Sequence, residues 1–194
     1  MTTIIYPLHL TKSTLKKRLL SYFFTNPESQ LYLREIALVL NVDPANLSRE
    51  LRNLKKEGIF ISKKQGLLKY FSLNHRYPLY EELKSIVFKT IGVKGALESL
   101  LKTIPGIRRG FIYGSFAKNM ERADSDIDIC LVIEKREFKE PFLLSGLHEL
   151  EKQLGREISY VYFTEDEWKQ KEKAKDSFIL GLQNSKRIDL TIPT

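Results

Sequence analysis

Ten residues separate a glycine–serine pair from two closely spaced aspartates, and each pair adjoins an apolar segment. One segment, IRRGFIY, runs directly into Gly114-Ser115, and the other, DIDICLVI, begins with Asp126 and Asp128. Residues two apart in a strand point to the same face, so both aspartates project from one side while Ile127 enters the core. The pattern predicts two apolar strands that present polar groups at their connected ends.

The residue types around these two pairs suit a site for a metal ion and a nucleotide. Carboxylates as close as those of Asp126 and Asp128 repel each other, and a divalent cation relieves that repulsion. Magnesium is commonly bound by one or two carboxylates together with nucleotide phosphates. Gly114 lets the backbone approach a phosphate closely, and Ser115 offers a hydroxyl at the start of a short helix, whose amides attract anions.

The strand, the GS pair, the interval and the D-x-D in a second strand together resemble the minimal nucleotidyltransferases of the DNA polymerase β superfamily, over roughly residues 94–165. Ser125 also fits that family's pattern, whereas Lys118-Asn119 stands where a glycine is usual. The resemblance implies attack of an acceptor hydroxyl on the α-phosphate of an NTP, with pyrophosphate leaving and Mg²⁺ (or Mn²⁺) as cofactor. It assigns nucleotide binding to Gly114, Ser115 and Lys118, and metal binding and catalysis to Asp126 and Asp128.

The family uses a third carboxylate, on a neighbouring strand, as general base and metal ligand. In the corresponding segment, REISYVYF, Ser159 stands where an aspartate is usual, and a hydroxyl is a poor base at neutral pH. Glu157 lies two residues earlier, hence on the same face of a strand, and is the predicted catalytic substitute. Asp189 is a more distant substitute. The alternative is that Glu157 is a surface residue and that the site has little or no activity.

The excess of positive charge lies entirely in the first part of the chain. Residues 1–78 hold 13 Lys and Arg against 5 Asp and Glu, whereas residues 79–194 hold 19 of each. A basic module at one end of a chain is typical of a protein that binds a polyanion such as nucleic acid. The alternative is a solvated basic surface on an ordinary domain.

Within the basic part, apolar periodicity predicts helices at 12–25 and 32–40 and a third between Asp43-Pro44 and Gly58. Two β-rich runs follow, at 60–64 and 67–73, joined by Gln65-Gly66 as a two-residue turn. Residues 12–75 resemble a winged helix-turn-helix domain of the prokaryotic regulator type. The resemblance implies that the third helix enters the major groove of duplex DNA.

The third helix has a buried leucine stripe and an exposed polar face, on which arginine suits guanine and asparagine suits adenine. Lysines of the hairpin are placed to meet phosphates. The residues that we assign to DNA contact are Asn46, Ser48, Arg49, Arg52, Asn53, Lys63 and Lys64. The alternative is that the charged members are ordinary surface residues of a packed helix.

We therefore expect an α+β protein of two parts. Residues 1–78 form the winged helix-turn-helix domain, residues 79–92 a connecting amphipathic helix, and residues 93–194 a nucleotidyltransferase-like domain with a small mixed α/β sheet. The elements expected in the last part are helices at 94–103 and 138–153, helical structure in one or two pieces at 165–183, and strands at 107–113, 126–133, 157–163 and 186–192.

Composition excludes several other classes of protein. One cysteine cannot form a disulfide framework or a cysteine zinc site, and the three histidines are not spaced as metal ligands. No apolar run approaches the roughly 20 residues that cross a bilayer, and the first residues do not resemble a signal peptide. We expect a cytoplasmic protein with no membrane partner.

Two functions follow from this combination. The first is a DNA-bound enzyme that transfers NMP to a protein hydroxyl, as in antitoxins of this family that modify a partner toxin, or to a small molecule, and that regulates transcription. The second is a transcription regulator that uses a weakly active nucleotidyltransferase fold as a nucleotide sensor. Because two-fold dimers extend a DNA half-site, we expect a homodimer.

Overall fold

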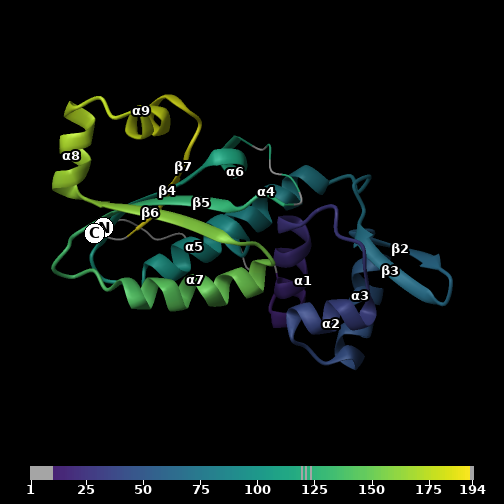
Figure 1. Cartoon of the computed structure of the whole chain (residues 1–194). Helices are drawn as coiled ribbons and strands as arrows, with labels where there is room; N and C mark the ends of the chain where they lie inside the picture. Colours follow the sequence, from purple (N-terminus) through teal and green to yellow (C-terminus); the bar gives the residue numbers. More distant parts are fainter. Residues whose placement is uncertain (1–10, 119, 121, 123, 193–194) are drawn as a thin grey trace, which may run out of the picture. The chain divides into compact units, whose positions relative to one another are not determined.

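The computed structural model describes residues 11–118, 120, 122 and 124–192, and it is a mixed α+β protein with two sheets (Figure 1). The chain divides into two compact units. The first runs to Gly95 and includes Lys152–Gly155, and the second holds Ala96–Glu151 and the chain from Arg156 onward.

The first unit combines helices with a three-stranded antiparallel sheet of order β1-β3-β2. Its elements are α1 (Thr14–Thr25), β1 (Leu31–Tyr32), α2 (Leu33–Leu40), α3 (Pro44–Lys56), β2 (Phe60–Gln65), β3 (Leu68–Leu73) and α4 (Tyr80–Thr90). The helices and the hairpin expected from periodicity are confirmed. Strand β1 was not predicted, because two residues are too few to show an alternation.

The turn between α2 and α3 is fixed by local chemistry. Asn41 ends α2 in the left-handed conformation, with φ of 48°. The carboxylate of Asp43 accepts hydrogen bonds from the amides of Ala45 and Asn46, and Pro44 occupies the first helical position. The leucine stripe predicted for α3 is fully buried: Leu47, Leu51 and Leu54 are 0% exposed.

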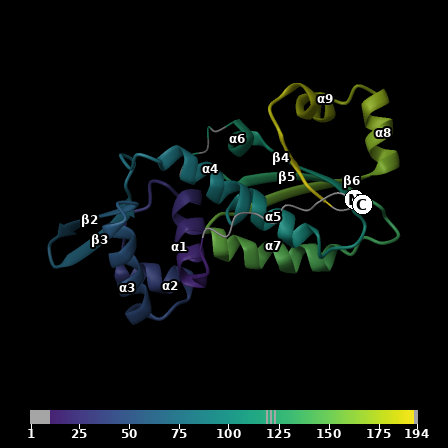
Figure 2. The ribbon, with the colours of Figure 1, turned by 180° about the vertical axis from the view of Figure 1, so that it is seen from behind.

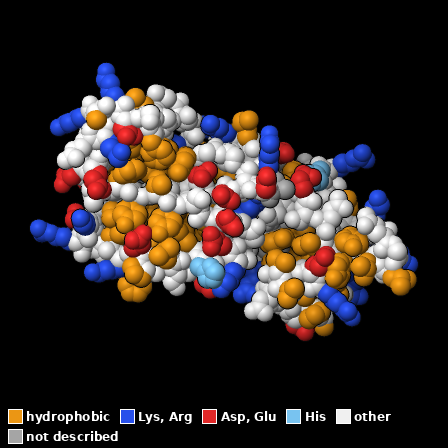
Figure 3. Space-filling model, in the orientation of Figure 1, with side chains coloured by type: hydrophobic (Ala, Val, Ile, Leu, Met, Phe, Trp, Pro, Cys, Tyr) orange, Lys and Arg blue, Asp and Glu red, His pale blue; other side chains and the backbone are white. Residues whose placement is uncertain are grey.

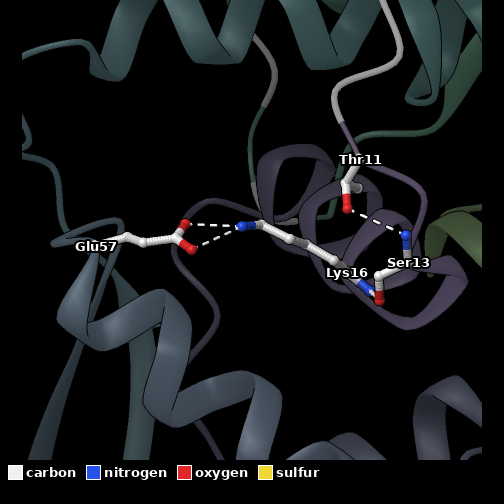
Figure 4. A network of polar contacts seen from close by, with 4 residues as sticks. All are labelled: Thr11, Ser13, Lys16 and Glu57. Carbon is white, nitrogen blue, oxygen red and sulfur yellow. Dashed lines mark hydrogen bonds and ion pairs between the residues drawn. The ribbon is translucent and has the colours of Figure 1, made fainter.

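The start of α1 is tied to the end of α3 by an ion pair. The hydroxyl of Ser13 accepts a hydrogen bond from the Lys16 amide at 3.1 Å, and the Ser13 amide donates to the Thr11 hydroxyl at 3.1 Å (Figure 4). The ammonium of Lys16 lies 2.7 Å from the carboxylate of Glu57, which follows α3 (Figure 4). Because the pair is partly solvated, it contributes little stability.

The hairpin turn lies one residue later than predicted. Gln65 still pairs with Leu68, so the two loop residues are Gly66 and Leu67, not Gln65-Gly66. Gly66 has φ of 60°, and a glycine at the first central position is typical of a type II′ turn.

One apolar core holds the first unit together, and α4 contributes to it. Phe23 of α1 meets Phe60 of β2 edge-to-face, with ring centroids 4.9 Å apart. Tyr80 and Val87 of α4 belong to the same core. Leu79, directly before α4, is 55% exposed.

The second unit is built on a four-stranded sheet of order β6-β5-β4-β7. Strand β5 pairs in parallel with β6 and antiparallel with β4, which pairs antiparallel with β7. The strands are β4 (Ile107–Tyr113), β5 (Ile127–Ile133), β6 (Ile158–Thr164) and β7 (Ile188–Leu190). The predicted strands are confirmed, with ends shifted by one or two residues.

Helices cover both faces of this sheet, and this arrangement is visible in both the front view and the back view (Figures 1 and 2). One side carries α5 (Val93–Leu101) and α7 (Glu140–Leu154), and the other carries α6 (Gly114–Lys118), α8 (Glu165–Lys173) and α9 (Ser177–Asn184). A capping box formed by Thr164 and Glu167 opens α8. Lys175, with φ of 53°, and the cap Asp176 divide the predicted helix 165–183 into α8 and α9.

Strand β5 is the centre of this unit because both of its faces are covered. Its residues are buried from Ile127 to Ile133 except Asp128, which is half-buried. Cys130 packs with Phe111 of β4, Trp168 of α8 and Ile179 of α9. The strand therefore fixes the position of its one polar side chain.

Some large apolar side chains of the second unit remain exposed. Phe142 is 65% exposed and Leu144 49%, and Figure 3 shows hydrophobic side chains gathered on the part of the molecule that holds β6 and α7. Tyr160 and Tyr162 of β6 both donate hydrogen bonds to Glu140.

No helix in the described residues is long and apolar enough to cross a membrane.

Candidate active site

The register of β4 and β5 brings the two sequence motifs together. Tyr113, the last residue of β4, pairs with Asp128 of β5. Gly114 and Ser115 follow at once and open α6. The glycine–serine pair therefore lies beside the aspartates, although ten residues separate them along the chain.

Gly114 fits this position for two independent reasons. Its φ of +70° is a conformation that side chains with a Cβ rarely adopt. A Cβ built at Gly114 would also collide with Oδ2 of Asp128. The carboxylate of Asp128 therefore lies directly against the backbone of α6, in space that only glycine leaves free.

Asp126 and Asp128 differ in their surroundings. The predicted strand 126–133 begins one residue later, at Ile127, so Asp126 is an exposed loop residue next to the strand. Burial, and secondly the charge of Asp126, raise the pKa of Asp128 above its usual value. Burial and then the charge of Asp128 also raise the pKa of Tyr113. The free site thus disfavours a second negative charge and favours a cation.

A hydroxyl occupies the place beside Asp128 on the neighbouring strand. Ser159 of β6 is the register partner of Asp128 and is exposed. Glu157 precedes β6 and is exposed, and its carbonyl accepts a hydrogen bond from the Ile127 amide at 2.9 Å. Asp189 pairs with Phe111, two strands from β5 and level with Cys130 instead of Asp128. Of the two acids suggested as substitutes, Glu157 therefore lies close to Asp128 and Asp189 lies farther away.

The carboxylates fit a metal ion that arrives with a nucleotide. Within the part of the chain that the structure describes, no three His, Cys, Asp or Glu side chains are grouped to hold a metal ion. Asp126 and Asp128 supply two carboxylates on one side of the sheet, and nucleotide phosphates commonly complete such a magnesium shell. This donor set, with its mutual repulsion, fits a magnesium–nucleotide complex better than an ion held by protein alone.

A cavity of about 300 Å³ is lined by Gly114, whose backbone Asp128 approaches closely. It carries two lysines, two serines and an aromatic pair, and it is lined by Tyr113, Gly114, Lys118, Ser177, Phe178, Gly181, Leu182, Ser185 and Lys186. The rings of Tyr113 and Phe178 meet edge-to-face, with centroids 5.6 Å apart. Of the predicted nucleotide-binding residues, Gly114 and Lys118 line this cavity, and Ser115 follows Gly114 but is not among its lining residues.

Sequence reasoning missed the wall of the cavity that α9 provides. Ser177, Phe178, Ser185 and Lys186 come about 60 residues or more after the GS pair. They follow no spacing relative to either motif. Only the packing of α9 near the sheet brings them to Gly114.

The residues predicted to contact DNA all lie in the first unit. Asn46, Arg49, Arg52 and Asn53 are exposed on α3, whereas Ser48 is half-buried. Lys63 and Lys64 are exposed on β2. The Arg49 guanidinium donates a hydrogen bond to Oδ1 of Asn46 at 2.9 Å, and Lys55 of α3 donates to Ser62 of β2. Helix α3 and the β2–β3 hairpin thus each expose polar side chains to solvent.

One protein-family model matches a large part of the second unit. Residues 96–181 match the family model described as Polymerase beta, Nucleotidyltransferase, so the chain carries a nucleotidyltransferase domain of this kind over those residues. No curated protein matches the chain. The crystal structure of a candidate nucleotidyltransferase from Sulfolobus solfataricus is similar, with 22% identity and a TM-score of 0.28, over 40% of this chain and 68% of that one.

Gly114→Ala should disturb the site and the fold together. The positive φ alone disfavours alanine by about 1–2 kcal/mol, and the methyl group must also displace the Asp128 carboxylate. We expect a lower free energy of unfolding in urea. Gly181→Ala, on α9 with no atom within 4 Å of the added Cβ, is the control and should not destabilise the protein. Equal stability of both variants would contradict the close approach described above.

Asp126→Asn should lower the pKa of Asp128. The substitution removes the charge that is the second cause of the raised pKa, and the effect of burial stays. A carboxyl ¹³C NMR titration would therefore show Asp128 losing its proton at a lower pH than in the parent protein. Asp124→Asn, in the same loop, is the matched control. An unchanged Asp128 titration in Asp126→Asn would show that the two carboxylates do not interact.

Proposed function

We propose that the second unit transfers a nucleoside monophosphate from a magnesium-bound NTP to an acceptor hydroxyl, and that the first unit binds duplex DNA. The observation that carries the first part is the contact of Asp128 with the backbone of Gly114, beside a cavity with two lysines, within a nucleotidyltransferase domain. Carboxylates for a cation and ammonium groups for phosphates adjoin there, as a charged nucleotide requires.

The cavity suggests how the nucleotide is oriented. Lys118 and Lys186 are its two cations and suit the triphosphate, with the hydroxyl of Ser115 at the start of α6. Phe178 and Tyr113 offer aromatic surface that suits the base or the sugar. This orientation sets the α-phosphate next to Asp126 and Asp128.

The proposed transfer uses the residues of this chain for positioning and for the proton. Mg²⁺, when bound, neutralises charge that develops on the phosphates. Asp126 and Asp128 hold the cation, and the acceptor oxygen bonds to the α-phosphorus as the bond to pyrophosphate breaks. We propose that Glu157 accepts the proton of the acceptor hydroxyl. The backbone carbonyl of Glu157 is hydrogen-bonded to the amide of Ile127, which lies between the two aspartates.

The serine at the register position beside Asp128 favours a second function. Ser159 cannot serve as a base at neutral pH, and Asp189 lies two strands away. A site that binds a nucleotide without turnover would act as a sensor, and the DNA-binding unit would respond to it. Both functions need the same metal–nucleotide complex, and they differ only in the release of pyrophosphate.

For the first unit we propose a winged helix-turn-helix domain that binds duplex DNA. Support comes from the three-residue turn between α2 and α3, the buried leucines and exposed polar face of α3, and the lysines of the β2–β3 hairpin. Asn46 and Arg49 also line a hollow of about 460 Å³ with Ser13 and Arg18 of the α1 region.

We further propose that the protein is a homodimer and that it has a role in transcription. As the acceptor of the nucleotide we propose a protein, such as a partner toxin, or a small molecule.

Asp126→Ala with Asp128→Ala should abolish binding of magnesium-bound NTP, because it removes both carboxylates that suit the cation. Calorimetry with each of the four Mg²⁺–NTPs measures the affinity, and pyrophosphate is assayed in the same samples. Asp124→Ala with Asp166→Ala removes two acidic charges from the same unit and is the control. Wild-type affinity in the first double variant would refute the site.

The same assay separates the enzyme from the sensor. If Glu157 is the base, Glu157→Gln should lower pyrophosphate release by about 10²–10⁴-fold and leave binding unchanged. If the parent protein binds nucleotide without releasing pyrophosphate, Ser159→Asp should restore release. No release from either protein would favour the sensor.

Binding of duplex DNA should depend on salt and on the first unit. Each phosphate contact contributes about −0.9 to the slope of log affinity against log salt. Lys63→Ala with Lys64→Ala should therefore flatten the slope in fluorescence anisotropy with random-sequence duplex. Arg49→Ala should narrow the spread of affinities among duplexes of different defined sequence. Lys169→Ala with Lys173→Ala, on α8, is the control. Binding that ignores salt and all these variants would leave the basic surface without this role.

A further inference from the structure

Arg156 is a buried cation that neither motif contains. Arg156 is only 7% exposed and directly precedes Glu157. Nη1 of its guanidinium donates hydrogen bonds to the carbonyls of Arg122, at 2.6 Å, and Ser125, at 2.9 Å. Both carbonyls belong to the loop that carries Asp126. A charged group in the interior therefore holds the backbone of two loop residues, Arg122 and Ser125.

The same guanidinium also meets the helix of the other motif. It lies over the ring of Phe116 in α6, 5.6 Å from the ring centroid. Phe116 directly follows Ser115 and is buried. Favourable contact of a guanidinium with an aromatic face is stronger where water is excluded. Arg156 thus contacts both segments that bear the predicted ligands of the metal and the nucleotide.

The backbone on each side of Asp126 is held by two consecutive residues. The carbonyl of Ser125, before it, accepts a hydrogen bond from Arg156, and the amide of Ile127, after it, donates one to the carbonyl of Glu157 at 2.9 Å. Within the loop, the Ser125 amide donates to the Arg122 carbonyl and the Arg122 amide to the Ser125 hydroxyl. Asp126 itself is exposed, so its position depends on these backbone contacts.

From these contacts we infer that Arg156 is a positioning residue that sets Asp126 relative to Asp128 and α6 for the divalent cation. This inference rests on the proposed function for its metal–nucleotide complex. Arg156 touches neither nucleotide nor metal in this scheme, and it acts through the loop. Outer-shell partners of this kind typically change metal affinity by about 10–100-fold when they are removed.

The test compares Arg156→Met with Arg156→Lys and with a matched control. Met keeps an apolar stem and loses all donors, whereas Lys keeps the charge without the planar guanidinium. Arg108→Met removes the same charge from an exposed residue that pairs with Glu137. ATP affinity is measured by calorimetry with Mn²⁺ and with EDTA, because only the first requires the placement of Asp126. Hydrogen exchange of the Ser125 and Ile127 amides reports on the loop without any ligand.

We expect Arg156→Met to lose about 10–100-fold of the Mn²⁺-dependent ATP affinity, to keep the affinity in EDTA, and to exchange both amides faster. Arg156→Lys should fall between Arg156→Met and the parent protein, and Arg108→Met should match the parent. Parental Mn²⁺-dependent affinity or parental exchange in Arg156→Met would overturn the inference. Equal losses with and without Mn²⁺, together with a lower melting temperature, would show a merely structural role and overturn it too.

Failure of the proposed function gives a different result. In that case the parent protein itself binds no ATP with Mn²⁺, and the role of Arg156 toward a cation is overturned with it. Exchange of the Ser125 and Ile127 amides would still show whether Arg156 holds the loop.

Discussion

The strand register around β5 is the constraint on which the site depends. Both faces of this strand are buried, so its apolar side chains fix which way each residue points. The hydrogen-bonded ladders then place Tyr113 on one side of Asp128 and Ser159 on the other. A slip by one residue would turn Asp128 into the apolar core and Ile129 toward Gly114. The chemistry of the site is therefore a consequence of apolar packing several residues away.

Electrostatics adds a preference to this geometry. Asp128 is partly withdrawn from water and lies near Asp126, and both effects oppose its negative charge. Lysines at the edge of the neighbouring cavity have the opposite sign. Residues 79–194 hold equal numbers of basic and acidic side chains, yet the second unit separates its charges on the scale of a single ligand. This separation suits a ligand that is itself divided into a cation and an anion.

Local signals explain which parts of the fold were predictable from the sequence. Asp43-Pro44 and the Thr164–Glu167 capping box each act within one turn, and both helices begin where these residues indicate. The hairpin was predicted one residue early, because the choice between Gln65-Gly66 and Gly66-Leu67 depends on pairing across the strands. Strand β1 is recognisable only from its pairing with β3.

The proximity of the candidate site residues was predictable only where spacing along the chain reports it. The GS and D-x-D residues adjoin sequential strands, so their meeting follows from one antiparallel pairing. Lys186 and Phe178 reach the cavity through α9, and Arg156 reaches the loop from the segment before β6. Contacts of this kind arise from the packing of distant elements, and neither periodicity nor a motif records them.

The half-buried Asp128 is also a point of local frustration in a strand that is otherwise consistent at every level. In the metal-free protein, an apolar residue there would satisfy packing and remove repulsion at once. Sequences tolerate such conflicts mainly where activity requires them. The residue that most weakens this strand as a structure is thus the residue to which we assign a cation. Selection for stability alone would convert the site into ordinary core, and the stability of the free protein and its capacity for a ligand change in opposite directions at this one position.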